Sequence, residues 1–178
     1  MIKKFIATAI LSAASAVAFA GDQYVDESGY AVSGYDVVAY HDLEQVEVGQ
    51  TQPEAVPGLK SITTEYNGAT WAFSTEENRD LFVANPTKYA PQYDGHCAYG
   101  ISQGGKVPAN PNLWRIVDEK LYININPAVV GFFEEDIPGF LEAGDKVWEK
   151  ELEAAAASDR SWKAIDSNTG TYSTDSPL

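Results

Sequence analysis

The sequence predicts an α+β fold, made of two short β-hairpins, several short helices and a longer C-terminal helix. Two stretches of β-prone residues, 61–73 and 114–124, are each interrupted by a tight-turn signal. Helix-start and helix-stop signals follow the first stretch, and apolar residues recur with helical spacing after the second. Hairpins and helices in separate stretches are typical of an α+β domain.

Each hairpin is predicted from its turn. Segments 61–66 and 69–73 flank the pair Asn67-Gly68, and this residue pair favours a two-residue turn because both positions need positive φ. The second hairpin spans 114–124, with its turn at residues 118–120.

The helices are predicted from their ends. A Ser-x-x-Glu capping box begins at Ser74, and Pro86 stops the helix that follows. After the second hairpin we expect a helix at 127–133 and a longer one from 137 to about 156.

The remaining segments complete one domain, predicted to span residues 34–157. Residues 21–33 are polar and are expected to form a loose lead-in, while 34–40 is an apolar run suited to a buried strand or a strand-like turn. Two prolines and no apolar periodicity predict a surface loop at 42–60. The Ser- and Thr-rich residues 158–178 are expected to form a mobile tail. We recognise no internal repeat in the sequence.

Residues 1–20 have the pattern of a secretory signal peptide. Two lysines precede an apolar run from residue 5 to 19, and the small residues Ala18 and Ala20 suit cleavage after Ala20. The run is shorter than the roughly 20 residues of a membrane span, so no span is expected after cleavage. The protein is therefore expected to be exported, to a periplasm or out of the cell.

The chain is strongly acidic, with a formal net charge of -14. Removing residues 1–20 takes away two lysines and no acids, which leaves 26 acids against 10 bases, or -16. This charge repels nucleic acid and anionic membranes. A phosphate-binding glycine loop is missing from the sequence, so we expect no organic cofactor.

The candidate chemistry lies in one cysteine and two histidines. Cys97 directly follows His96, and His41 directly follows the apolar run 34–40. If that run lies beside Cys97, two imidazoles and a thiolate would converge, a set that suits copper or zinc. Adjacent side chains rarely reach one ion, so His41 is the better partner for Cys97. Cys97 as an inert buried residue, or as a reactive thiol activated by His41, remain alternatives.

Acidic and aromatic residues near these stretches are candidates for a ligand pocket. A carboxylate there would orient a histidine ring or cap a turn, and tyrosine rings would line the walls. The candidate pocket-lining residues are Tyr35, Asp36, Tyr40, Tyr93, Asp94 and Tyr99.

Several motifs, in order along the chain, resemble the YHS domain family and especially its exported single-domain bacterial members. The resemblance covers about residues 34–148. It is carried by Gly34-Tyr-Asp-Val-Val-Ala-Tyr40, Tyr66-Asn-Gly-Ala-Thr-Trp-Ala-Phe-Ser74, Phe82-Val-Ala-Asn-Pro86, Tyr89-Ala-Pro-Gln-Tyr93 and Cys97-Ala-Tyr-Gly100.

The resemblance implies a YHS-like fold and a metal-related role, with two departures. Metal-handling relatives carry cysteines at positions that correspond here to Phe73 and roughly Asn78, which cannot act as thiolates. Positions 41 and 96 are usually aromatic in the family, and both are histidine here.

Together these observations predict an exported small binding protein rather than an enzyme. Its expected ligand is copper or zinc, bound through Cys97 and His41 and also His96. The alternatives are a thiol-based enzyme or redox sensor that uses Cys97, and a metal-free module that binds a partner or a small molecule.

Overall fold

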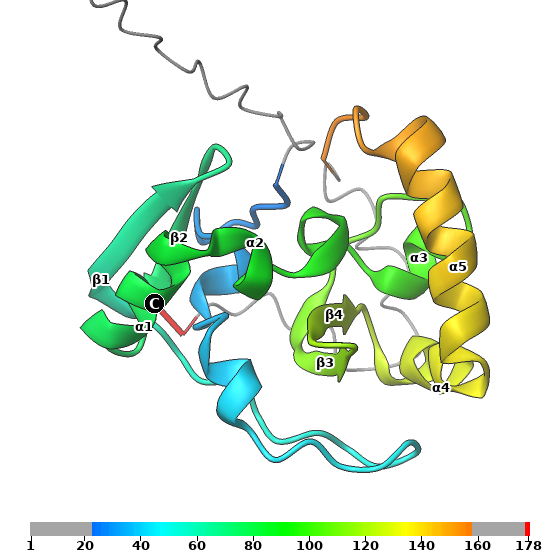
Figure 1. Cartoon of the computed structure of the whole chain (residues 1–178), viewed down its shortest axis with the longest axis horizontal. Helices are drawn as coiled ribbons and strands as arrows, with labels where there is room; N and C mark the ends of the chain where they lie inside the picture. The colour runs from blue at the N-terminus through cyan, green and yellow to red at the C-terminus, as the bar shows by residue number, and fades with distance from the viewer. Residues whose placement is uncertain (1–22, 158–176) are drawn as a thin grey trace, which may run out of the picture.

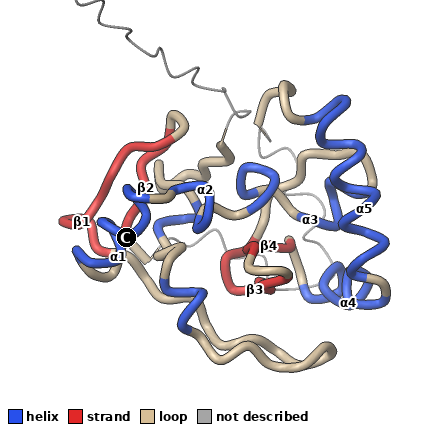
Figure 2. Tube along the Cα trace, in the orientation of Figure 1, coloured by secondary structure: helices blue, strands red, loops and turns tan. Residues whose placement is uncertain are grey.

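The computed structural model describes residues 23–157 and 177–178, and it confirms the α+β prediction (Figures 1 and 2). The predicted signal peptide and most of the predicted tail lie outside the described residues. The strands are β1 (Leu59–Tyr66), β2 (Ala69–Phe73), β3 (Asn110–Val117) and β4 (Lys120–Asn124). The α-helices are α1 (Glu76–Ala84), α2 (Pro86–Tyr89), α3 (Ala98–Ser102), α4 (Pro127–Glu135) and α5 (Ile137–Val147). Short 3₁₀ turns lie at Val32–Gly34, Ala39–Asp42 and Gln92–Gly95, and a π-helical turn lies at Trp148–Leu152.

Both predicted hairpins form, each as a separate two-stranded antiparallel sheet. Asn67 and Gly68 have φ values of 49° and 72°, as the predicted turn requires. The second turn is made by Asp118 and Glu119, with φ values of 49° and 63°. The strand β3 begins at Asn110, four residues before the predicted start at 114. In Figure 1 the first hairpin lies with α1 and α2, and the second lies with α3, α4 and α5.

The first long helix begins one residue later than the capping box predicts. Thr75 is the N-cap, and its hydroxyl accepts a hydrogen bond from the Asn78 backbone N–H at 3.1 Å. The Ser74 hydroxyl instead donates to the Asp36 carboxylate at 2.6 Å. The C-terminal helix is shorter than predicted: α5 ends at Val147, and the π-helical turn follows.

The structure decides one N-terminal alternative and corrects one prediction. Residues 34–40 form turns, the second of the two alternatives, because the Asp36 carboxylate accepts the backbone N–H groups of Val38 and Ala39 and bends the chain into a 3₁₀ turn. Residues 23–33 are packed and not loose. Tyr24 is buried and its N–H donates to the Asp94 carbonyl at 2.9 Å.

Two hydrophobic clusters hold the fold. The larger joins the first hairpin, α1 and the inner residues of β4, and it includes Trp71, Phe82 and Ile123. The smaller lies under α5 and includes Tyr122 and Phe133. None of the described helices is long and apolar enough to cross a membrane.

Candidate functional site

Cys97 is a buried helix cap. Its sulfur is 3.4 Å from the Gly100 N–H, which donates to it, and its thiol donates to the Asn124 side-chain oxygen at 3.4 Å. Burial raises the pKa of the Cys97 thiol to about 11, although backbone N–H groups around it act in the opposite direction. Because the thiolate is the reactive and metal-binding form, this environment opposes both roles at neutral pH.

His96 is adjacent in sequence but sits in a different environment. The ring is fully buried, its Nδ1 donates to the Tyr93 carbonyl at 2.9 Å, and it packs against Tyr24 with 5.5 Å between ring centres. Burial lowers the pKa of His96 to about 4. The imidazole is therefore neutral and acts as part of the core.

The buried His96 predicts an acid-sensitive stability. The pKa of His96 is about 4 in the folded state against 6.5 ordinarily, so the unfolded chain takes up a proton first as the pH falls. Stability is complete above pH 6.5 and is lost between pH 6.5 and 4, by about 3 kcal/mol for a shift of roughly 2.5 units. Urea unfolding at pH 7.5 and pH 5 measures the part of this loss that occurs above pH 5, about 2 kcal/mol. In His96→Phe the pH dependence should shrink, and an unchanged dependence would contradict the assignment.

His41 is the predicted site residue that faces an open pocket. The pocket has a volume of about 450 Å³, and the His41 ring meets Tyr89 edge-on at 5.3 Å. The Nε2 atom of His41 is buried and has no hydrogen-bond partner among the described residues. Burial and then Lys88 lower the pKa of His41, while Asp42 and Glu119 oppose the shift. Val38, Leu81 and Ile116 complete the lining.

The structure does not bring Cys97 and His41 together. Cys97 bonds to Asn124, the last residue of β4, whereas His41 shares its pocket with Glu119, directly before the first residue of that strand. From residue 120 to 124 a strand rises about 13 Å, while zinc ligands lie at about 2.0–2.3 Å from the ion. Within residues 23–157 and 177–178, no group of three or more His, Cys, Asp or Glu side chains is arranged to hold a metal ion.

Asp36 is a structural hub and not a pocket residue. Its fully buried carboxylate accepts five hydrogen bonds. One oxygen takes the N–H groups of Val38 and Ala39. The other takes the N–H and hydroxyl of Ser74 and the side-chain amide of Asn78, at 2.6–2.8 Å. Asp36 therefore ties the segment before the first hairpin to the start of α1.

The other predicted pocket residues divide between surface and interior. Tyr93 and Asp94 line a shallow surface pocket of about 230 Å³. Tyr40 is buried and its hydroxyl donates to a backbone carbonyl at 2.8 Å, while Tyr35 is half-buried against the core. Tyr99 packs against two phenylalanine rings at 5.0 and 5.9 Å.

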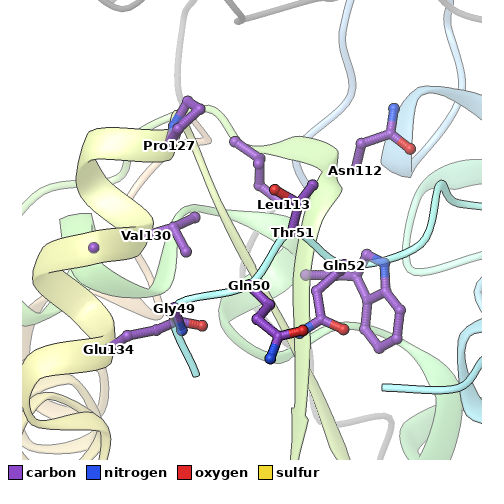
Figure 3. A pocket seen from close by; sticks show the side chains of 11 residues that line it. Gly49, Gln50, Thr51, Gln52, Asn112, Leu113, Pro127, Val130 and Glu134 are labelled. Atoms are coloured by element: carbon purple, nitrogen blue, oxygen red, sulfur yellow. Dashed lines mark hydrogen bonds between the residues drawn. The ribbon is translucent and has the colours of Figure 1, made fainter. Parts of the chain in front are cut away.

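A third pocket, of about 260 Å³, lies between the 42–58 loop, β3 and α4 (Figure 3). Leu113 and Val130 form apolar walls, and the amides of Gln50 and Asn112 lie at the sides. Glu134 closes one end, where its carboxylate accepts the Gly49 N–H at 2.8 Å.

Sequence reasoning did not find the charged residues that surround His41. Lys88 comes from α2, and Glu119 comes from the turn between β3 and β4. The turn was readable in the sequence, whereas Pro86 was read only as the end of the preceding helix. Their approach to His41 depends on how the two hairpins pack, which no local pattern specifies.

The comparison with protein families confirms the predicted resemblance: the YHS domain model matches residues 53–93. The matched segment contains the first hairpin, α1 and α2, and it ends at Tyr93. The searches of curated proteins and of solved structures give no match.

Proposed function

We propose that this chain, whose residues 53–93 match the model of the YHS domain, a domain associated with metal binding, is an exported binding protein for a transition-metal ion, copper or zinc. The proposed first ligand is the Nε2 atom of His41. The supporting observation is that this atom is buried, has no partner among the described residues, and belongs to a residue that lines an open pocket.

The described side chains around His41 do not form a ready-made set of three metal ligands, so the proposed site is a weak and exchangeable one that forms when side chains move. Imidazole nitrogen suits both copper and zinc, and the carboxylates of Asp42 and Glu119 line the same pocket. Both acids are exposed, so their side chains are free to change rotamer when an ion arrives. The lowered pKa of His41 keeps the ring neutral at physiological pH, as metal binding requires.

Cys97 does not belong to this proposed site. Its sulfur is enclosed among backbone N–H groups and Asn124, and it lies at the far end of β4 from His41. The same burial argues against the thiol-enzyme alternative, because a thiol with a pKa of about 11 is almost entirely protonated at neutral pH.

Equilibrium dialysis or calorimetry of the purified protein with Cu(II) and Zn(II) tests the proposal. We expect His41→Phe to weaken binding by at least about 10-fold, since it removes the nitrogen ligand and keeps the ring contact with Tyr89. Cys97→Ala should leave binding unchanged. Equal metal binding by wild type and His41→Phe would contradict the proposal. A loss of metal binding in Cys97→Ala alone would show that the thiol is the ligand.

A further inference from the structure

The two hairpins have the same dimensions and a constant spacing. β1 and β3 each have 8 residues, and β2 and β4 each have 5. β1 begins at residue 59 and β3 at 110, while β2 begins at 69 and β4 at 120, so each strand of the second hairpin starts 51 residues after its counterpart. Both hairpins turn through two consecutive residues of positive φ.

The register of the two hairpins is irregular at the same place. In the first, Leu59 pairs with Phe73, and the regular ladder resumes at Thr63. In the second, Asn110 pairs with Asn124, and the ladder resumes four residues later in the same way. A bulge at one register position is a specific backbone feature that two unrelated hairpins rarely share.

The helices that follow continue the correspondence at the same spacing of 51. α1 and α4 each have 9 residues, and their N-caps are Thr75 and Asn126. Both helices bury one phenylalanine, Phe82 or Phe133, to 1% exposure. The residues that end the two helices have nearly the same backbone angles, with φ -151° and ψ 73° at Asn85 and φ -154° and ψ 69° at Asp136. In both cases a second helix begins at the next residue.

The segments before the hairpins also correspond, at a spacing of 61. Residues 32–34 and 93–95 are each three consecutive residues with positive φ. Asp36 N–H donates to the Val56 carbonyl at 2.9 Å, and Cys97 N–H donates to the Val107 carbonyl at 2.9 Å. The spacing changes from 61 to 51 because the loop before the hairpin is ten residues longer in the first half of the chain than in the second.

Asp36 and Cys97 cap their turns in the same way. The Asp36 carboxylate accepts three backbone N–H groups, from Val38, Ala39 and Ser74. The corresponding N–H groups of Tyr99, Gly100 and Ile125 all act on Cys97, where they oppose the effect of burial on its pKa. The Asn124 amide oxygen also accepts the Tyr99 N–H, at 3.1 Å.

We infer that the chain is a tandem repeat of one unit, residues 32–89 and 93–147, and that the second unit holds a closed counterpart of the His41 pocket. The YHS domain model matches the first unit only. The sequence hides the repeat because Phe82 and Phe133 are the only identical pair between residues 59–89 and 110–140. This corrects the expectation of no internal repeat.

The lining residues of the first unit all differ from their counterparts in the second unit, and the largest increase in side-chain size is at Val38. Val38 lines the open pocket of the first unit, and the corresponding residue of the second unit is Tyr99. The Tyr99 ring packs against Phe132 and Phe140, the counterparts of Leu81 and Tyr89. We assign to Val38 the main part in keeping the His41 pocket open, and the metal-binding part of this inference rests on the proposed function.

The repeat itself is tested without any ligand. Cys97→Asp places a carboxylate where Asp36 has one, but without the Ser74 hydroxyl and the Asn78 amide that donate to it at 2.6 and 2.7 Å in the first unit. The repeat assigns Val129 to the position of Asn78. We expect Cys97→Asp to lower the urea midpoint and added Val129→Asn to recover at least half of that loss. The control, Val130→Asn in the same background, should recover nothing. Equal recovery by both, recovery by neither, or failure of both double variants to fold would overturn the repeat.

The pocket is tested by Val38→Tyr, with Tyr99→Val as the matched reverse change. The expected result for Val38→Tyr is a native circular dichroism spectrum with binding of Cu(II) or Zn(II) weakened at least 10-fold. Tyr99→Val should leave metal binding unchanged. Full metal binding by folded Val38→Tyr, or loss of the fold, would overturn the role assigned to Val38. A failed His41→Phe test would remove the proposed function and leave the repeat intact.

Discussion

Asp36→Ala is expected to lower the free energy of unfolding by about 3–5 kcal/mol, because it leaves several hydrogen-bond donors without an acceptor. The carboxylate is fully buried and accepts five hydrogen bonds from Val38, Ala39, Ser74 and Asn78. Its removal leaves a cavity and unpaired N–H groups at the junction between the 3₁₀ turn and α1. Urea unfolding followed by circular dichroism measures the loss.

Variants that each remove one hydrogen-bond partner distinguish the Asp36 network from ordinary helix capping. Ser74→Ala and Asn78→Ala each remove one side-chain donor to Asp36, so each should cost about 1–3 kcal/mol. Thr75→Ala removes only the N-cap bond and should cost about 1 kcal/mol. If Asp36→Ala cost no more than Thr75→Ala, the hub assignment would be wrong.

The hairpins were predictable because their signals are local. The Asn67-Gly68 pair fixes a turn by its own backbone preference, and both residues adopt positive φ. The 34–40 segment left strand and turn open because its apolar residues are buried as a strand would be. The turn forms because the Asp36 carboxylate accepts the N–H groups of Val38 and Ala39. Ser74 and Asn78 hold the same carboxylate from 38 and 42 residues away, and contacts at that separation leave no periodicity in the sequence.

The sequence predicted which residue types could form a site, but not which of these residues lie together in space. His41 was found as a candidate because histidine is rare in this chain, and it does line a pocket. Cys97 was found for the same reason, but its surroundings make it a helix cap. The repeat explains why: Cys97 stands where the first unit has its buried capping carboxylate.

Arg115→Met is expected to destabilise the fold by about 3–5 kcal/mol, because it leaves the Glu134 carboxylate charged in a nearly closed site. Both side chains are less than a tenth exposed, and Arg115 Nε donates to Glu134 at 3.0 Å. The guanidinium also donates to the carbonyl groups of Val46 and Glu47 in the long loop of the first unit. Unfolding in urea at 0.1 M and 1 M salt should give a similar loss, since a buried pair is little screened.

The double variant Arg115→Met/Glu134→Leu decides whether the charge or the loop contacts dominate. If the stranded carboxylate causes the loss, removing it as well should recover stability, and the double variant should be more stable than Arg115→Met alone. If the stability losses of the two substitutions simply add, the stabilisation comes instead from the bonds between Arg115 and the carbonyl groups of the loop. In either variant the Gly49 N–H loses protection from hydrogen exchange once Glu134 is released or removed. Because the same loop walls the 260 Å³ pocket, its release would also open that pocket to solvent.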